Sequence, residues 1–206
     1  FMKYAYIFAA ALALAAVSCV PESNTDDPNS ANPYPTTTNV VLNEIDGNSK
    51  LIEIYNGTSS AVSLTGWTIV KDGTKTVWTG VKGQVIASKT YVVLNSVDLW
   101  DLDGDGVISD TEKDASYNSN MAAGLIFDSG ISAKKSVQIK ILDASGNAVD
   151  TFERGAEPWG SKGYFENTES SFSRVPTGTG VWKYAAPTAG KPNPDTETGE
   201  IEQVTA

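Results

Sequence analysis

LIEIYNGTSSAVSLTGWTIVKDG, residues 51–73, carries the clearest structural pattern in the chain. It opens with Leu51 to Tyr55, where apolar and polar side chains alternate as they do in a strand with one buried face. Turn-forming residues follow, and Trp67 to Val70 then forms a second apolar run that stops at an Asp-Gly turn. Two short runs, each closed by turn residues, predict neighbouring antiparallel strands.

Similar runs continue on both sides of this segment. They lie at residues 40–45, 76–78, 91–94, 125–127, 137–142, 148–152 and 172–175. Turn signals rich in Gly, Asn, Asp and Ser separate them. The best helical pattern is a short one at residues 110–115. The chain is therefore predicted to be all-β, an antiparallel sandwich or barrel.

The order of these elements resembles that of lamin tail domains. That family has an Asn-Glu strand, then Glu-x-Tyr-Asn, then Leu-x-Gly-Trp before an Asp-Gly turn. The corresponding residues here are Asn43-Glu44, Glu53, Tyr55-Asn56, Leu64 and Gly66-Trp67. Residues 141–152 and 171–193 resemble the family's hairpin and its last strand and exit. The resemblance covers residues 38–193 and implies an immunoglobulin-like antiparallel β-sandwich that acts as a structural or binding module.

The strand patterns also assign side chains to the core. Three aromatic residues on strands are expected there: Trp67, Phe172 and Trp182. A strand aromatic can instead stack on a sugar, and Trp100 and Trp159, in loop-like sequence, are the better candidates for exposed rings. Arg174 is expected to pair with a carboxylate such as that of Glu44 or Glu53.

A long insertion, placed at residues 96–123, contains DLDGDGVISDTE at residues 101–112. A calcium loop of this length takes oxygen ligands at positions 1, 3, 5, 7, 9 and 12, with Gly at position 6. The residues at the ligand positions are Asp101, Asp103, Asp105, Val107 (through its carbonyl), Ser109 (through water) and Glu112. Gly106 stands at position 6. The sequence therefore predicts a Ca2+ site in an EF-hand-like loop.

The same residues also fit a solvated acidic turn. Ser109 and Glu112 form a capping-box pattern that would begin a short helix near Asp110, and such a helix would direct Glu112 back to the loop. Ile108 is expected to anchor the loop to the core. The sequence has no second loop of this kind, so we expect a structural calcium site and not a sensor.

The N-terminal segment predicts export. The run from Ala5 to Val17 is shorter than the ~20 residues that a membrane-spanning helix needs, and it is typical of a signal peptide. Residues 16–19 resemble a bacterial lipobox, which predicts a signal peptide at 1–18 and a lipid on Cys19. The alternative is an ordinary cleaved signal with an incidental Cys19. We take Met2 as the true start of translation.

The segments that flank the sandwich are expected to be flexible. Residues 19–37 are rich in Pro, Asn, Ser and Asp and are predicted to be a tether, and residues 194–206 a tail. The expected location is the bacterial cell envelope, at the outer membrane, because Val20 is not the Asp associated with inner-membrane retention. The acidic residues 22–27 are compatible with exposure at the cell surface.

Composition excludes several classes of function. The chain has 206 residues, a formal net charge of −10, no histidine and one cysteine. An acidic protein without a basic stripe is a poor ligand for nucleic acid. The lack of histidine removes the usual general base and the commonest zinc ligand.

A non-catalytic envelope lipoprotein for adhesion or for binding a protein or carbohydrate is therefore the main functional hypothesis. The calcium-ordered insertion would present the recognition surface, for which the candidates are Trp100, Tyr117, Asn118 and Asn120. A calcium-dependent hydrolase that uses carboxylates and a structural subunit of a surface assembly are the alternatives.

Overall fold

The computed structural model describes residues 40–133, 135–154, 170–194 and 199–200. The predicted signal peptide, Cys19, the tether, Trp159 and most of the predicted tail lie outside the described residues. In the described part, no helix has the length and apolar character that crossing a membrane requires.

The described residues form mainly short strands. They are β1 (Val40–Asp46), β2 (Leu51–Asn56), β3 (Val62–Ser63), β4 (Thr68–Lys71), β5 (Lys75–Thr79), β6 (Val85–Ile86), β7 (Tyr91–Ser96), β8 (Ile126–Phe127), β9 (Val137–Leu142), β10 (Ala148–Arg154), β11 (Ser171–Val175), β12 (Val181–Ala185) and β13 (Gly199–Glu200). A 3-10 helix, η1 (Val97–Leu99), and the helix α1 (Ala115–Ala122) both lie between β7 and β8.

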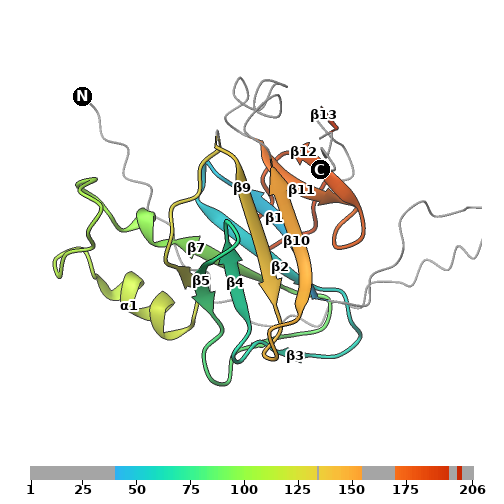
Figure 1. The fold of residues 1–206 in the computed structure, drawn as a ribbon, viewed down its shortest axis with the longest axis horizontal. Coiled ribbons are helices and arrows are strands. Elements are labelled where there is room, and N and C mark those ends of the chain that lie inside the picture. Colours follow the sequence, from blue (N-terminus) through green and yellow to red (C-terminus); the bar gives the residue numbers. More distant parts are fainter. Residues whose placement is uncertain (1–39, 134, 155–169, 195–198, 201–206) are drawn as a thin grey trace, which may run out of the picture. The chain divides into compact units, whose positions relative to one another are not determined.

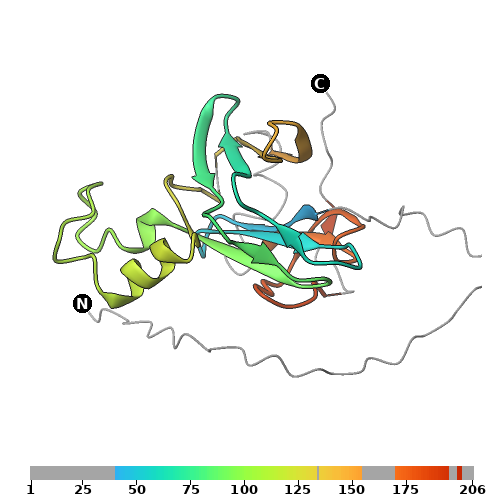
Figure 2. The same cartoon turned by 90° about the horizontal axis from the view of Figure 1, so that it is seen from below.

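The strands build a two-layer sandwich (Figures 1 and 2). One sheet has seven strands in the order β13-β12-β11-β1-β2-β7-β8, and the other has four in the order β10-β9-β4-β5. The strands β3 and β6 form a separate small pair. All pairings are antiparallel except β7 with β8, which is parallel. The predicted all-β sandwich is confirmed.

The core fills the space between the two sheets. A row of buried side chains in register crosses the larger sheet: Tyr184, Phe172, Ile45, Ile52 and Leu94. From the smaller sheet, Phe152 packs against Phe172 and Trp182, with ring centroids 5.4 and 4.7 Å apart. Burial of Phe172 and Trp182 agrees with the prediction from the sequence. Because successive side chains of a strand point to opposite faces of the sheet, every second side chain points into this core.

The structure corrects two predictions, one about the burial of Trp67 and one about the partner of Arg174. Trp67 is only half-buried at the edge of the core, and Trp78 is the buried indole instead. Arg174 pairs with Asp150 on β10, with both carboxylate oxygens 2.8 Å from Nη2, and not with Glu44 or Glu53. The reason is register. Ser173 lies opposite Glu44, so the next residue, Arg174, points to the other face of the sheet.

Candidate metal centre in the insertion

The insertion leaves the sandwich at the end of β7 and extends away from the two sheets before it returns at β8 (Figures 1 and 2). Its base is anchored to the sandwich by side chains. The indole Nε1 of Trp78 donates to the carbonyl oxygen of Gly124 over 2.7 Å, and Ser96 Oγ donates to the Ser129 carbonyl oxygen over 2.8 Å. These contacts fix where the insertion starts and ends.

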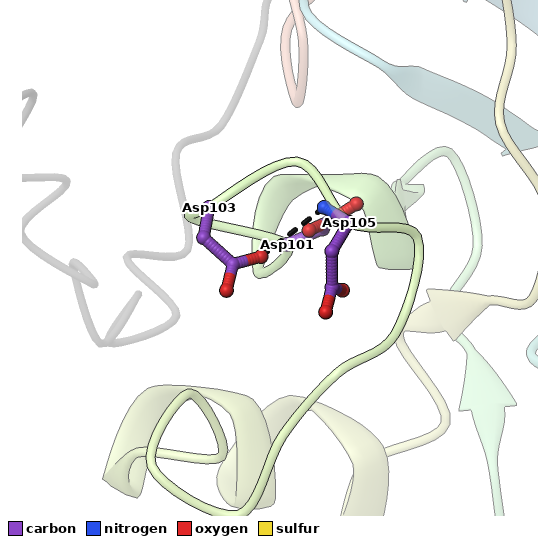
Figure 3. Close-up of side chains that lie close together, drawn as sticks. All are labelled: Asp101, Asp103 and Asp105. Atoms are coloured by element: carbon purple, nitrogen blue, oxygen red, sulfur yellow. Dashed lines mark hydrogen bonds between the residues drawn. The ribbon is translucent and has the colours of Figure 1, made fainter.

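Three of the predicted ligands lie together in this loop. Asp101, Asp103 and Asp105 each offer one carboxylate oxygen, and these oxygens all lie within 4.8 Å of one another (Figure 3). The Asp103 and Asp105 side chains are exposed, and Asp101 is half-buried. Like charges at this separation repel each other in water, and a divalent cation at their centre would remove that repulsion.

Backbone turns explain why the aspartates converge. Asp101 accepts hydrogen bonds from the amides of Gly104 and Gly106, each over 2.9 Å. Both glycines have positive φ, 78° and 84°, a region that side chains with a Cβ rarely adopt. Asp103 Oδ1 accepts from the Asp105 amide and Asp105 Oδ1 from the Val107 amide. Each aspartate thus stabilises the turn that follows it.

The same hydrogen bonds leave ligand oxygens available. Within the described residues, Oδ2 of Asp103 and Oδ2 of Asp105 accept no hydrogen bond. An all-oxygen donor set of carboxylates is the kind that Ca2+ prefers, and it is unsuited to soft metals. The residues present therefore fit a calcium ion.

The structure does not group Glu112 with the three aspartates. Glu112 is buried, and its carboxylate holds the loop's two ends together by accepting from the Leu102 amide over 2.7 Å and from the Ser109 amide over 2.8 Å. Ser109 Oγ also donates to Glu112 Oε2 over 2.7 Å. Hydrogen bonds from the Ser109 amide and hydroxyl, and from the Leu102 amide, lower the pKa of Glu112 and keep it ionised. Of the other predicted ligands, Val107 follows Asp105 in the turn and donates its amide to Asp105 Oδ1 over 2.8 Å, and Ser109 is hydrogen-bonded to Glu112.

The helix begins later than the capping-box pattern predicts. Glu112 does reach back to the Ser109 amide, but this closes a single turn. The helix α1 starts at Ala115, where Asp114 is the N-cap and accepts from the Tyr117 amide over 2.7 Å. The Ser109 hydroxyl instead donates to Glu112. Ile108, predicted to anchor the loop, is half-buried and is not part of the hydrophobic core cluster.

The candidate recognition residues also lie in the insertion. Trp100 and Tyr117 pack edge to face, with ring centroids 5.7 Å apart, and both are half-buried. Asn118 Nδ2 donates to backbone carbonyls at the start of α1, and Asn120 Nδ2 donates to the Ser116 carbonyl. The aromatic pair connects the entrance of the loop at residues 101–112 to the helix that follows it.

A comparison with known protein families identifies the family to which this fold belongs. A family model described as the lamin tail domain matches residues 33–156, which is more than half of the chain. The chain belongs to the lamin tail domain family. The lamin tail domain is an immunoglobulin-like β-sandwich, a class of module that is generally non-catalytic. The comparison with curated proteins gives no match.

The Asn-Glu residues of this lamin tail domain fasten the end of the sandwich to its first strand. Asn43 Nδ2 donates to Glu53 Oε1 over 2.7 Å, and Asn43 Oδ1 accepts from the Gly178 amide over 2.8 Å. Asn193 Nδ2 donates to the carbonyls of Asn43 and Arg174 over 3.0 and 2.8 Å. Sequence reasoning did not assign Asn193 a role. The sequence signal for these contacts was the presence of two polar residues, Asn43 and Glu44, in the otherwise apolar run of residues 40–45.

The two glutamates of the lamin tail domain pattern hold the residues just before Asn193. Glu44 and Glu53 lie opposite each other on β1 and β2, and both are fully buried. Glu44 accepts from the amide and hydroxyl of Thr188, and Glu53 accepts from the Gly190 amide over 2.5 Å. Burial raises the pKa of Glu44, and burial together with the neighbouring Glu44 charge raises the pKa of Glu53 to about 7.

Proposed function

We propose that this lamin tail domain is a non-catalytic binding module of the bacterial cell envelope whose insertion is ordered by one calcium ion. The observation that carries the proposal is the convergence of three carboxylate oxygens within 4.8 Å on a loop shaped by Gly104 and Gly106. An exported protein meets calcium at about millimolar concentration, so a site with a Kd of about 10⁻⁴–10⁻³ M stays largely filled.

Five residues of the loop would supply oxygen donors to the ion. Asp101, Asp103 and Asp105 supply carboxylate oxygens, with the Val107 carbonyl and, through water, Ser109 as further donors. Glu112 joins the two ends of the loop and adds negative charge beside the site. The calcium would neutralise repulsion and hold the turns, and so fix the position of the Trp100–Tyr117 pair.

The recognition role rests on this ordering. The candidates are Trp100, Tyr117, Asn118 and Asn120, of which Asn118 is exposed and the other three are half-buried. They lie on a loop region carried by a rigid scaffold, which is where binding residues concentrate in proteins. The ligand class proposed is a protein or a carbohydrate. Attachment to the membrane through a lipid on Cys19 would display the module at the envelope.

A hydrolase gains no support from the carboxylates in the sandwich. Glu44 and Glu53 form a close pair, but they are fully buried and their oxygens accept hydrogen bonds from Thr188 and Gly190. A substrate would have to displace this segment to reach them. The geometry supports a structural task for the pair.

Thermal melting of the full chain in calcium and in chelator tests the calcium proposal. Calcium should raise the melting temperature, and Asp103→Ala should abolish the shift because it removes one ligand. Asp143→Ala is the matched control, since Asp143 stabilises a similar turn by accepting from the Ser145 and Asn147 amides but lies in the β9–β10 hairpin. If Asp103→Ala kept the full calcium shift, the site would be misplaced.

The envelope proposal has its own test. When the gene is expressed in a bacterium fed with radiolabelled palmitate, the wild-type protein should incorporate label and fractionate with membranes. The Cys19→Ser variant should do neither. Equal labelling of both forms would refute lipidation at Cys19.

A further inference from the structure

The insertion carries an unusual share of exposed apolar side chains. Among the described residues, the exposed large hydrophobic residues are Leu99, Leu102, Val107, Met121, Val85 and Val181, and the first four belong to residues 96–123. Leu102 is 76% exposed and Val107 64%, the two highest values of the six. Contiguous exposed apolar surface marks contact sites for partners, so the segment with most of the exposed apolar side chains is the first place to look for one.

Leu102 lies within the sequence of the carboxylate cluster, and Val107 follows its last aspartate by two residues. Leu102 lies between Asp101 and Asp103, and its amide donates to Glu112. The Val107 amide donates to Asp105 Oδ1 over 2.8 Å. Neither side chain can be a calcium ligand, so calcium binding does not account for two apolar residues at these exposed positions.

The insertion also concentrates negative charge. Residues 96–123 contain seven acidic side chains and one basic side chain, Lys113, which gives a formal charge of −6 out of −10 for the whole chain. One calcium ion would leave −4. Leu102 and Val107 are therefore strongly exposed apolar side chains within an acidic segment.

We propose that Leu102 and Val107 dock a protein segment that presents Lys or Arg side chains around apolar ones. Charge decides this choice of partner. A second copy of the chain would bring like charges together, and anionic lipid headgroups would be repelled by the carboxylates. A basic amphipathic segment meets both requirements, because its apolar face covers the two side chains and its cations face the acids. The inference rests on the proposed function, since a calcium-ordered loop holds the two residues in place.

The test uses the full chain in 2 mM calcium and a designed 18-residue helical peptide of Leu and Lys. A Lys/Ser peptide of equal charge is the control for non-specific attraction. The Leu/Lys peptide should bind more tightly than its control, and Leu102→Ser with Val107→Ser should weaken its binding about tenfold. The matched variant, Val85→Ser with Val181→Ser, removes two exposed valines outside the insertion and should bind as the wild type does.

Three results would overturn the inference. They are equal binding of the two peptides, equal binding by the two double variants, and binding to phosphatidylglycerol vesicles that depends on Leu102 and Val107 while the peptide fails to bind. The calcium melting shift, measured on the same samples, separates this inference from the proposed function. A retained shift with no peptide binding refutes only the docking surface, whereas loss of the shift in wild-type protein refutes the calcium site itself.

Discussion

The stability of the protein should fall as the pH rises from 5 to 8. The chain has no histidine, the group that titrates in this range in most proteins. Burial raises the pKa of Glu53 from 4.5 to about 7 and raises the pKa of Glu44 as well. A carboxyl group with a higher pKa in the folded state binds its proton more tightly there. Its contribution is complete below pH 4.5 and is lost as the pH rises through about 7.

The magnitude follows from the Glu53 shift. A change of about 2.5 pH units at 1.36 kcal/mol each corresponds to about 3 kcal/mol in the free energy of unfolding. For a domain of this size, that difference lowers the melting temperature by roughly 6–12 °C. The shift of Glu44 acts in the same direction.

Urea unfolding at pH 5, 6, 7 and 8, at constant ionic strength and in chelator, measures this effect. Glu53→Gln cannot titrate, so its unfolding free energy should change with pH by about 3 kcal/mol less than that of the wild type. Glu153→Gln is the control, because Glu153 is exposed on β10 and its replacement should leave the slope unchanged. Stability that is constant or rises from pH 5 to 8, or parallel profiles for the wild type and Glu53→Gln, would show that Glu53 does not titrate with a raised pKa in the folded protein.

Three further substitutions test contacts in the sandwich by chemical denaturation. Asp150→Ala leaves Arg174 without its carboxylate and the Leu42 amide without its acceptor, and should cost about 3 kcal/mol; a cost near zero would contradict the role of this pair. Asn193→Ala removes two donated hydrogen bonds to β1 and β11 and should cost about 2 kcal/mol and expose residues 186–194 to proteases, whereas unchanged cleavage would argue against that fastening. Gly80→Ala would drive a Cβ into the Leu64 carbonyl oxygen and should cost about 3 kcal/mol, so an unchanged midpoint would show that the backbone can move there.

Much of the sandwich was predictable because its longer strands have period-two patterns. Leu51 to Tyr55 and Val137 to Leu142 carry that signal, and the structure places strands at both. The two-residue strands β3 and β6 are too short to show a period and were not predicted, whereas β8 was predicted from the apolar run at residues 125–127. The parallel pairing of β8 with β7 depends on how the insertion returns to the sandwich, which no local pattern encodes.

Local sequence patterns also predicted only part of the candidate site. The aspartates at alternating positions of one short loop converge because their own turns are local, so spacing alone predicted the cluster. The position of Glu112 depends on the path of the whole loop, and the start of α1 depends on competition between Ser109 and Asp114 for the cap. The partner of Arg174 depends on how two sheets face each other, which separation in sequence does not reveal.

Calorimetric titration of calcium into the full chain is the decisive measurement for the proposed site. One bound ion with a Kd of about 10⁻⁴–10⁻³ M is expected. Asp101→Ala or Asp105→Ala should remove the binding heat, while Asp143→Ala should preserve it. No heat from the wild-type protein at millimolar calcium, or heat that persists in both cluster variants, would contradict the claim that residues 101–112 form a calcium site.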